Sequence, residues 1–156
     1  MHILEELKQI VAKLDEEGIE YALCGGLAMA VYAMPRATLD IDMMIEMDSV
    51  QPARRAAEEL GFVLDADPME FRGGGVQIFR LCKVDPGSHE GLVLDFLVVT
   101  PETREAWESR QSVEWEGGVL RVVSPQGLVK LKTLRSSGQD RDDIDHLRSI
   151  ADEDED

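Results

Sequence analysis

Hydrophobic residues recur along the chain at two spacings, one typical of helices and one typical of strands. Apolar side chains three and four residues apart, or a capping residue followed by such a run, predict helices over residues 2–17, 52–60, 101–110 and 125–136. Alternating or wholly apolar runs predict strands over residues 21–24, 39–45, 62–64, 76–84 and 92–99, and a hairpin of strands over residues 112–116 and 119–123.

The mixture of the two kinds of segment favours a single α/β (α+β) domain. We expect a mixed β-sheet of about five strands with helices packed on one face, within residues 1–150. The chain has 156 residues, of which 44% are hydrophobic, which suits one domain with one core. The acidic residues 151–156 are expected to be a disordered tail.

Two carboxylates lie at alternate positions of one predicted strand. Because strand side chains alternate in direction, Asp40 and Asp42 are expected on one face about 7 Å apart, while Leu39, Ile41 and Met43 point into the core. Like charges this close repel each other unless a cation lies between them. Mg²⁺ prefers oxygen ligands and is commonly held by one or two carboxylates together with substrate phosphates. The pair therefore predicts a magnesium site beside a phosphorylated substrate.

A pair of glycines precedes this strand and is the candidate phosphate-binding turn. Gly25 and Gly26 allow a tight backbone turn and a close approach to a ligand, and the apolar residues after them predict a short helix. Backbone amides at the start of that helix would face the phosphates. Arg36 and Thr38 lie on the return to the acidic strand, just ahead of Asp40.

The joint pattern of Gly25-Gly26, Arg36, Thr38, Asp40 and Asp42 resembles the signature of the polymerase-beta-like nucleotidyltransferase superfamily. Gly-Gly-Leu-Ala followed by Pro-Arg-Ala-Thr-Leu-Asp-Ile-Asp is most similar to small bacterial members related to the toxins of abortive-infection toxin-antitoxin pairs. The resemblance implies a nucleotidyltransferase-like fold in which the acids bind two Mg²⁺ ions. It also implies that the glycines, Arg36 and Thr38 lie around the phosphates of an NTP.

A lone carboxylate, Asp95, lies in the middle of the most apolar predicted strand. An unpaired charge there would cost several kcal/mol, so Asp95 requires a compensating partner. One interpretation is a structural salt bridge, with Arg80 as the candidate partner. The other is a third metal ligand that meets Asp40 and Asp42 from a neighbouring strand. The resemblance agrees with the second, since the superfamily takes its third carboxylate from a later strand.

The resemblance further implies that a lysine on a helix after the third carboxylate contacts the nucleotide phosphates. Lys132 is the matching position and Lys130 is the alternative, although both also suit a solvated helix face. A last helix is expected to begin near Asp140, and the resemblance implies that Asp140 or Asp143 orients Lys132. Asp140 fits equally well as a helix cap.

Charge and cysteine content restrict the partners and the compartment. The formal net charge is −16, from 16 basic and 32 acidic residues, so we expect no extensive nucleic-acid surface. The two cysteines, Cys24 and Cys82, predict free thiols in a reducing compartment. No apolar run approaches the roughly 20 residues of a membrane helix. We therefore expect a cytoplasmic protein with no membrane association.

These observations predict a Mg²⁺-dependent enzyme that moves a nucleoside monophosphate from an NTP to an acceptor hydroxyl and releases pyrophosphate. Asp40, Asp42 and Asp95 are the candidate catalytic and metal-binding residues. The acceptor stays open among a small molecule, a protein and a tRNA, and an antitoxin is a candidate partner. The alternative is a catalytically inactive regulatory module that binds a nucleotide or a partner protein.

Overall fold

The structure, a computed structural model, describes residues 2–32, 40–116 and 118–134. The helices in these ranges are α1 (Ile3–Glu16), α2 (Gly25–Val31), α3 (Val50–Glu59), α4 (Arg104–Glu108) and α5 (Pro125–Thr133), with short 3-10 helices η1 (Met47–Ser49) and η2 (Arg72–Gly74). The strands are β1 (Ala22–Cys24), β2 (Asp40–Ile45), β3 (Leu64–Asp65), β4 (Met69–Phe71), β5 (Val76–Val84), β6 (Gly91–Val98), β7 (Gln111–Trp115) and β8 (Gly118–Val122). The helix expected near Asp140 and the tail 151–156 lie outside the described residues.

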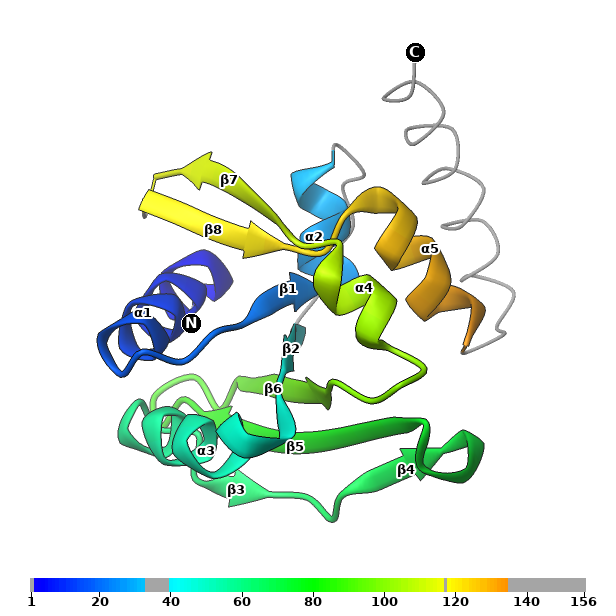
Figure 1. Ribbon diagram of the computed structural model, residues 1–156. Coiled ribbons are helices and arrows are strands. Elements are labelled where there is room, and N and C mark those ends of the chain that lie inside the picture. The colour runs from blue at the N-terminus through cyan, green and yellow to red at the C-terminus, as the bar shows by residue number, and fades with distance from the viewer. Residues whose placement is uncertain (1, 33–39, 117, 135–156) are drawn as a thin grey trace.

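The strands form one mixed sheet, which confirms the predicted fold class. Their order is β3-β5-β6-β2-β1-β8-β7, and β4 also pairs with β5 (Figure 1). The β2–β6 and β1–β8 pairs are parallel, and the other pairs are antiparallel. Within the described residues the sheet has eight strands rather than about five. The prediction was low because β4 is too short to show an alternating pattern, and because the β7–β8 hairpin extends the same sheet through β1. The strand predicted over residues 62–64 is observed as β3, which ends one residue later and is two residues long.

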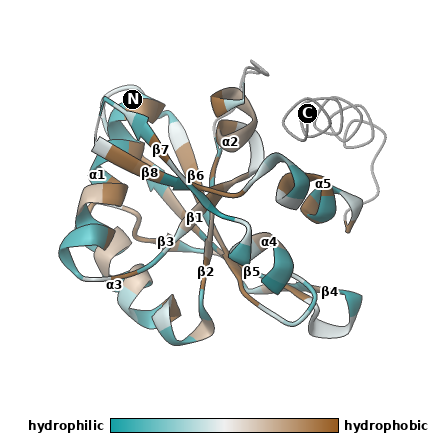
Figure 2. Cartoon of the chain, turned by 45° about the horizontal axis from the view of Figure 1, so that its top comes forward, coloured by the Kyte–Doolittle hydropathy of each residue, from teal (hydrophilic) through white to brown (hydrophobic). Residues whose placement is uncertain are grey.

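Helices α1 and α3 cover one face of the sheet (Figure 1). Leu7, Ile10 and Leu14 of α1 are at most 2% exposed. Figure 2 shows hydrophobic residues along β1 and a mixture of hydrophobic and hydrophilic residues on α1 and α3, as expected of helices with one buried side. None of the described helices is long and apolar enough to span a bilayer.

A partly buried ion pair joins α1 to this face of the sheet. The Lys83 ammonium of β5 donates to both carboxylate oxygens of Glu6, at 3.0 and 2.9 Å, and lies 5.8 Å from the centre of the Phe62 ring. The Glu6 side chain is 11% exposed and the Lys83 side chain 23%. On the same face of β5, Phe79 lies under the guanidinium of Arg54 from α3, at 5.9 Å. Arg80 and Cys82 alternate with these residues and therefore point to the opposite face.

Helix α5 lies over that opposite face and begins where its sequence predicts. The Ser124 hydroxyl accepts a hydrogen bond from the Gly127 amide at 3.0 Å, and Pro125 occupies the first helical turn. A side chain at Gly127 would come within 2.4 Å of the Ser109 hydroxyl. The Ser124 cap and the lack of a side chain at Gly127 together determine the direction in which α5 leaves the sheet.

Helix α4 begins at Arg104 rather than at Pro101, because two threonines hold residues 100–103 in a turn. The Thr103 hydroxyl accepts from the Thr100 amide at 2.8 Å, and the Thr100 hydroxyl donates to the Gly75 carbonyl at 2.6 Å. These bonds anchor the turn between β6 and α4 to the end of the β4–β5 hairpin. Gly73 and Gly74 have positive φ within that hairpin, a conformation that glycine adopts readily in a tight turn.

We expect Lys83→Met to lower the free energy of unfolding by about 2 kcal/mol, between the values typical of exposed and buried pairs, because Glu6 would lose its counter-charge. Urea denaturation followed by circular dichroism measures the change. The double substitution Glu6→Leu with Lys83→Met should recover most of the loss, since it leaves no unpaired carboxylate. Equal stability of wild type and Lys83→Met would show that the pair contributes nothing.

Candidate functional site

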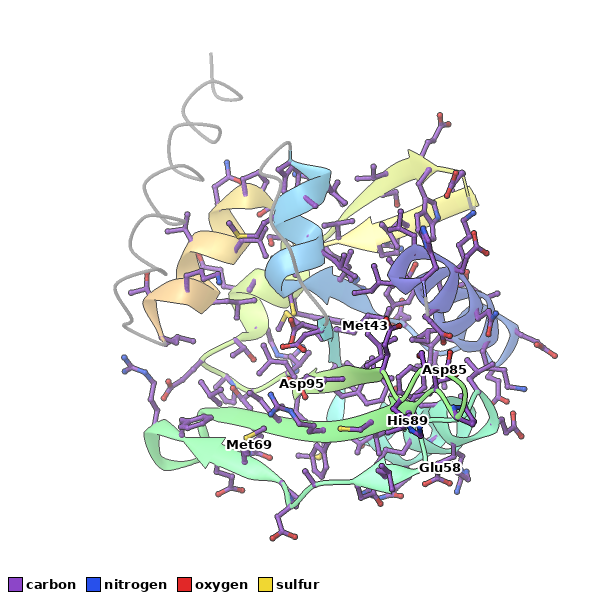
Figure 3. The ribbon with its side chains drawn as sticks, turned by 180° about the vertical axis from the view of Figure 1, so that it is seen from behind. Met43, Glu58, Met69, Asp85, His89 and Asp95 are labelled. Carbon is purple, nitrogen blue, oxygen red and sulfur yellow. The ribbon has the colours of Figure 1, made fainter. Side chains whose placement is uncertain are left out.

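A pocket between the sheet and α5 contains four of the residues singled out in the sequence: Gly25, Asp42, Asp95 and Lys132. Its remaining wall is mostly apolar and consists of Cys24, Val76, Ile78, Leu97, Thr103, Leu128, Leu131 and Leu134. Figure 3 shows Asp95 on β6, near the middle of the molecule. The lining of an otherwise apolar pocket therefore includes two carboxylates and one lysine.

Strand register brings the acids together. In the parallel β2–β6 pair, Asp42 lies opposite Asp95 and Asp40 lies opposite Val93. Asp40 and Asp42 are partly exposed and two residues apart, so they share the face of the sheet on which Asp95 lies. On the other side of β6, Arg80 of β5 lies opposite Asp95. Arg80, Asp95 and Asp42 thus form a row across three neighbouring strands, which we call the transverse row.

Within the transverse row, Asp95 and Arg80 make a bidentate ion pair. Arg80 Nε donates to Asp95 Oδ1 at 2.8 Å, and an Nη atom donates to Oδ2 at 2.9 Å. This hydrogen-bonded pairing raises the pKa of the Arg80 guanidinium above its ordinary value; desolvation opposes the shift, and the charges of Asp95 and Asp40 add to it. The salt bridge that the sequence left open as one interpretation is therefore present, and Asp95 still lines the pocket beside Asp42.

Gly25 is required by the position of Asp42. Its φ of +69° lies in the left-handed region, which favours glycine. A Cβ atom built on Gly25 would lie 2.2 Å from Asp42 Oδ2. The carboxylate therefore occupies the space that a side chain would fill, and the backbone at the start of α2 lies directly against the first acid of the pocket.

Of the two candidate lysines, only Lys132 lies in the pocket. Lys132 is 9% exposed, although its place in the helix pattern suited a solvated side chain. Its burial follows from the packing of α5 over the pocket, which Leu128, Leu131 and Leu134 also line. Lys130 points elsewhere and forms an exposed ion pair with Glu105 of α4. The structure thus separates the two lysines where the sequence did not.

The other predicted site residues are not brought into this pocket by the described part of the chain. Asp40 and Gly26 are described but do not line it. Arg36, Thr38, Asp140 and Asp143 lie outside the described residues. Sequence reasoning missed Thr103 and the apolar wall, and it treated Arg80 only as a salt-bridge partner. The alternation of β5 places Arg80 on the correct face, but only the register with β6 places it beside Asp95.

The turn of the β4–β5 hairpin forms part of the rim of the pocket. Arg72 Nε donates to the carbonyl of Leu134, at the end of α5, at 3.1 Å. Val76, just after this turn, and Leu134 both line the pocket. Together with the Thr100–Gly75 bond, this contact joins the hairpin to two other elements around the opening.

The carboxylates suit a hard divalent cation, although they are not assembled into a three-acid site. Among residues 2–32, 40–116 and 118–134, no three His, Cys, Asp or Glu side chains are grouped so as to hold a metal ion. Both oxygens of Asp95 are engaged by Arg80. One or two carboxylates with substrate phosphates are nevertheless the usual ligands of Mg²⁺. Asp42, adjoining the glycine backbone, and Asp40 fit that requirement; the two-ion site stays a prediction.

No protein-family model and no curated protein sequence matches the chain. Solved structures do match. The antibiotic-resistance factor ANT(2'')-Ia is similar with a TM-score of 0.63 and 15% identity, over 93% of this chain and 82% of that one. The same factor in complex with adenylyl-2''-tobramycin gives a TM-score of 0.53 and 16% identity, over 94% and 97% of the two chains. TM1012 of Thermotoga maritima, assigned as a nucleotidyltransferase, gives 0.57 and 16%, over 97% and 93%. The chain therefore has the nucleotidyltransferase fold.

We expect Gly25→Ala to lower the free energy of unfolding by more than Gly18→Ala does, with a difference of about 1–3 kcal/mol. Both glycines have nearly the same φ, +69° and +70°, so the backbone cost is matched. Nothing lies within 4 Å of a Cβ on Gly18, whereas the Cβ on Gly25 overlaps Asp42. Chemical denaturation measures both. Equal losses would mean that the contact with Asp42 imposes no constraint.

Proposed function

We propose that this chain is a nucleotidyltransferase that moves a nucleoside monophosphate from an NTP to an acceptor hydroxyl and releases pyrophosphate. One observation carries the proposal: within a nucleotidyltransferase fold, Gly25, Asp42, Asp95 and Lys132 line one pocket. The glycine backbone, the carboxylates and the buried ammonium are the groups that such a reaction needs, and they come from four separate elements. Acids on neighbouring strands that line one pocket favour the binding of a cation there.

Each side chain has a role that its position supports. Asp40 and Asp42 would hold Mg²⁺, which when bound supplies positive charge to the phosphates. The backbone of Gly25 and Gly26 would lie close to the triphosphate, because no side chain intervenes. The Lys132 ammonium would contact a phosphate from the opposite wall of the pocket. In this proposal Arg36 and Thr38 complete the phosphate contacts.

The reaction joins the acceptor oxygen to the α-phosphorus as the bond from that phosphorus to the pyrophosphate oxygen breaks. Asp95, when Arg80 releases it, would hold the ion beside the acceptor and help to take the hydroxyl proton, and the pyrophosphate would leave past Lys132. Most of the rate enhancement would come from positioning and from charge stabilisation. The two-ion version of this site requires Asp95 oxygens for the second ion, and Arg80 now engages those oxygens.

A small or basic acceptor suits this chain better than a large RNA. The net charge of −16 opposes a broad surface for phosphate backbones. The ANT(2'')-Ia complex contains an adenylated small molecule, which is a precedent for such an acceptor on this fold. A role as the toxin of a toxin-antitoxin pair rests on the sequence resemblance alone.

A second candidate function is a catalytically inactive module that binds a nucleotide or a partner protein. The Arg80–Asp95 ion pair favours it, because a neutralised third carboxylate would suffice for binding without transfer. Pyrophosphate release separates the two functions. A module would bind NTP without releasing pyrophosphate under any acceptor tested.

We expect Asp42→Asn to reduce pyrophosphate release by about 10²–10³-fold, because a metal ligand and its charge are lost. The assay supplies each NTP with Mg²⁺ and with panels of small cationic and hydroxyl-bearing acceptors. Asp67→Asn is the matched control, since Asp67 is exposed and away from the pocket. Loss of activity in both variants, or in neither, would contradict the role given to Asp42.

Lys132→Met should reduce kcat/KM for NTP by about 10–100-fold, since the ammonium that faces the phosphates is removed while the length of the side chain is kept. Lys130→Met removes the same charge from a position of α5 that lies outside the pocket. It should leave kcat/KM within about twofold of the wild-type value, because exposed ion pairs contribute little. Steady-state kinetics with NTP varied measures both. A larger effect at Lys130 would exchange the roles of the two lysines.

A further inference from the structure

The transverse row contains a permanent cation next to the acid that a second metal ion would need. Arg80 lies on one side of Asp95 and Asp42 lies on the other, on neighbouring strands. An arginine keeps its charge at any pH at which the protein is folded, and its planar fork matches a carboxylate. Asp95 therefore has a permanent counter-charge supplied by the chain itself.

The guanidinium uses both carboxylate oxygens. The two bonds, at 2.8 and 2.9 Å, take one lone pair from each oxygen of Asp95. A divalent ion shared by Asp42 and Asp95 would have to bind the same carboxylate and would lie close to the guanidinium charge. Repulsion between the two cations, and competition for the oxygens, both oppose the second ion.

The two partners differ in their freedom to move. The Asp95 side chain is 5% exposed and is fixed in the middle of β6. The Arg80 side chain is 38% exposed and comes from β5, on the side of β6 away from β2. The guanidinium could turn into solvent without opening the core, but the carboxylate could not follow it. Any separation of the pair would therefore leave Asp95 in the pocket, facing Asp42.

We propose that Arg80 is a positioning residue that competes with a divalent cation for Asp95. An ion binds on the acceptor side of the site only when the guanidinium turns away, so Arg80 sets how tightly that ion is held. This inference rests on the proposed function, since it concerns the metal site of that function. It assigns a role to the salt bridge beyond holding the fold together.

The competing explanation is that Arg80 only orients Asp95, and the two explanations predict opposite signs. If Arg80 competes, Arg80→Met should tighten the binding of Mn²⁺ by about tenfold, because a nearby positive charge is removed and both oxygens are released. If Arg80 only orients, the same substitution should weaken the binding of Mn²⁺, because an unpaired carboxylate at 5% exposure loses its fixed position and charge.

The experiment measures binding of Mn²⁺ and Mg²⁺ alone, without NTP. Electron paramagnetic resonance counts free and bound Mn²⁺, and thermal unfolding at increasing Mg²⁺ reports the same equilibrium. Arg104→Met is the matched control, because it removes the same charge from an exposed pair with Glu46. The affinity of this variant for Mn²⁺ should equal that of wild type. Arg80→Lys keeps the charge but loses the fork, and should tighten binding by about threefold.

Each outcome decides between the explanations. Tighter binding in Arg80→Met, with more Mn²⁺ bound per chain at a given concentration, supports competition; unchanged or weaker binding overturns it. If Arg80→Met does not fold without metal, the change in the Mn²⁺ affinity of Arg80→Lys decides: tighter binding supports competition, and unchanged or weaker binding overturns it. Asp42→Asn tests the site itself. Binding in wild type that is lost in Asp42→Asn, with no gain in Arg80→Met, rejects the inference alone, whereas no ion binding in any variant rejects the proposed metal site.

Discussion

The parallel pairing of β2 with β6 is the constraint on which the candidate site depends. Its register places Asp42 opposite Asp95, and a shift by one residue would turn one of the acids to the other face of the sheet. This register leaves two like charges on neighbouring strands and partly removes them from water, which is electrostatically unfavourable. Arg80 of the neighbouring strand β5 offsets the repulsion on one side of the two acids. A cation bound beside Asp42 and Gly25 would offset it on the other side.

The parts of the site that could be predicted from the sequence are those set by residues close together in the chain. Asp40 and Asp42 share a face because side chains in any strand alternate. Gly25 could be singled out because glycine next to a strand end is typical of a tight turn, although the structure gives a further reason in its contact with Asp42. Ser124-Pro125 opens α5 for equally local reasons.

What could not be predicted depends on pairing between distant segments. A salt bridge with Arg80 was one of two open interpretations for Asp95, and only the register of the β5–β6 hairpin shows that Arg80 pairs with Asp95 while Asp95 also lines the pocket beside Asp42. Lys132 suited a solvated side chain because it lies off the apolar positions of α5, and its burial depends on how α5 packs over the pocket. Strand β4 is three residues long and has no periodicity to detect, and of the strand predicted over residues 62–64 only Leu64 belongs to β3.

The rim of the pocket has a consequence for how a ligand would enter. The turn at residues 72–75 bonds both to the end of α5, through Arg72, and to the turn before α4, through Thr100. Three stretches that are remote in sequence are thereby linked at the entrance. Fluctuations there should be concerted, so that fraying of the last turn of α5 also loosens the hairpin. Entry of a ligand would then depend on the concerted opening of these three linked stretches rather than on the rotation of any single side chain.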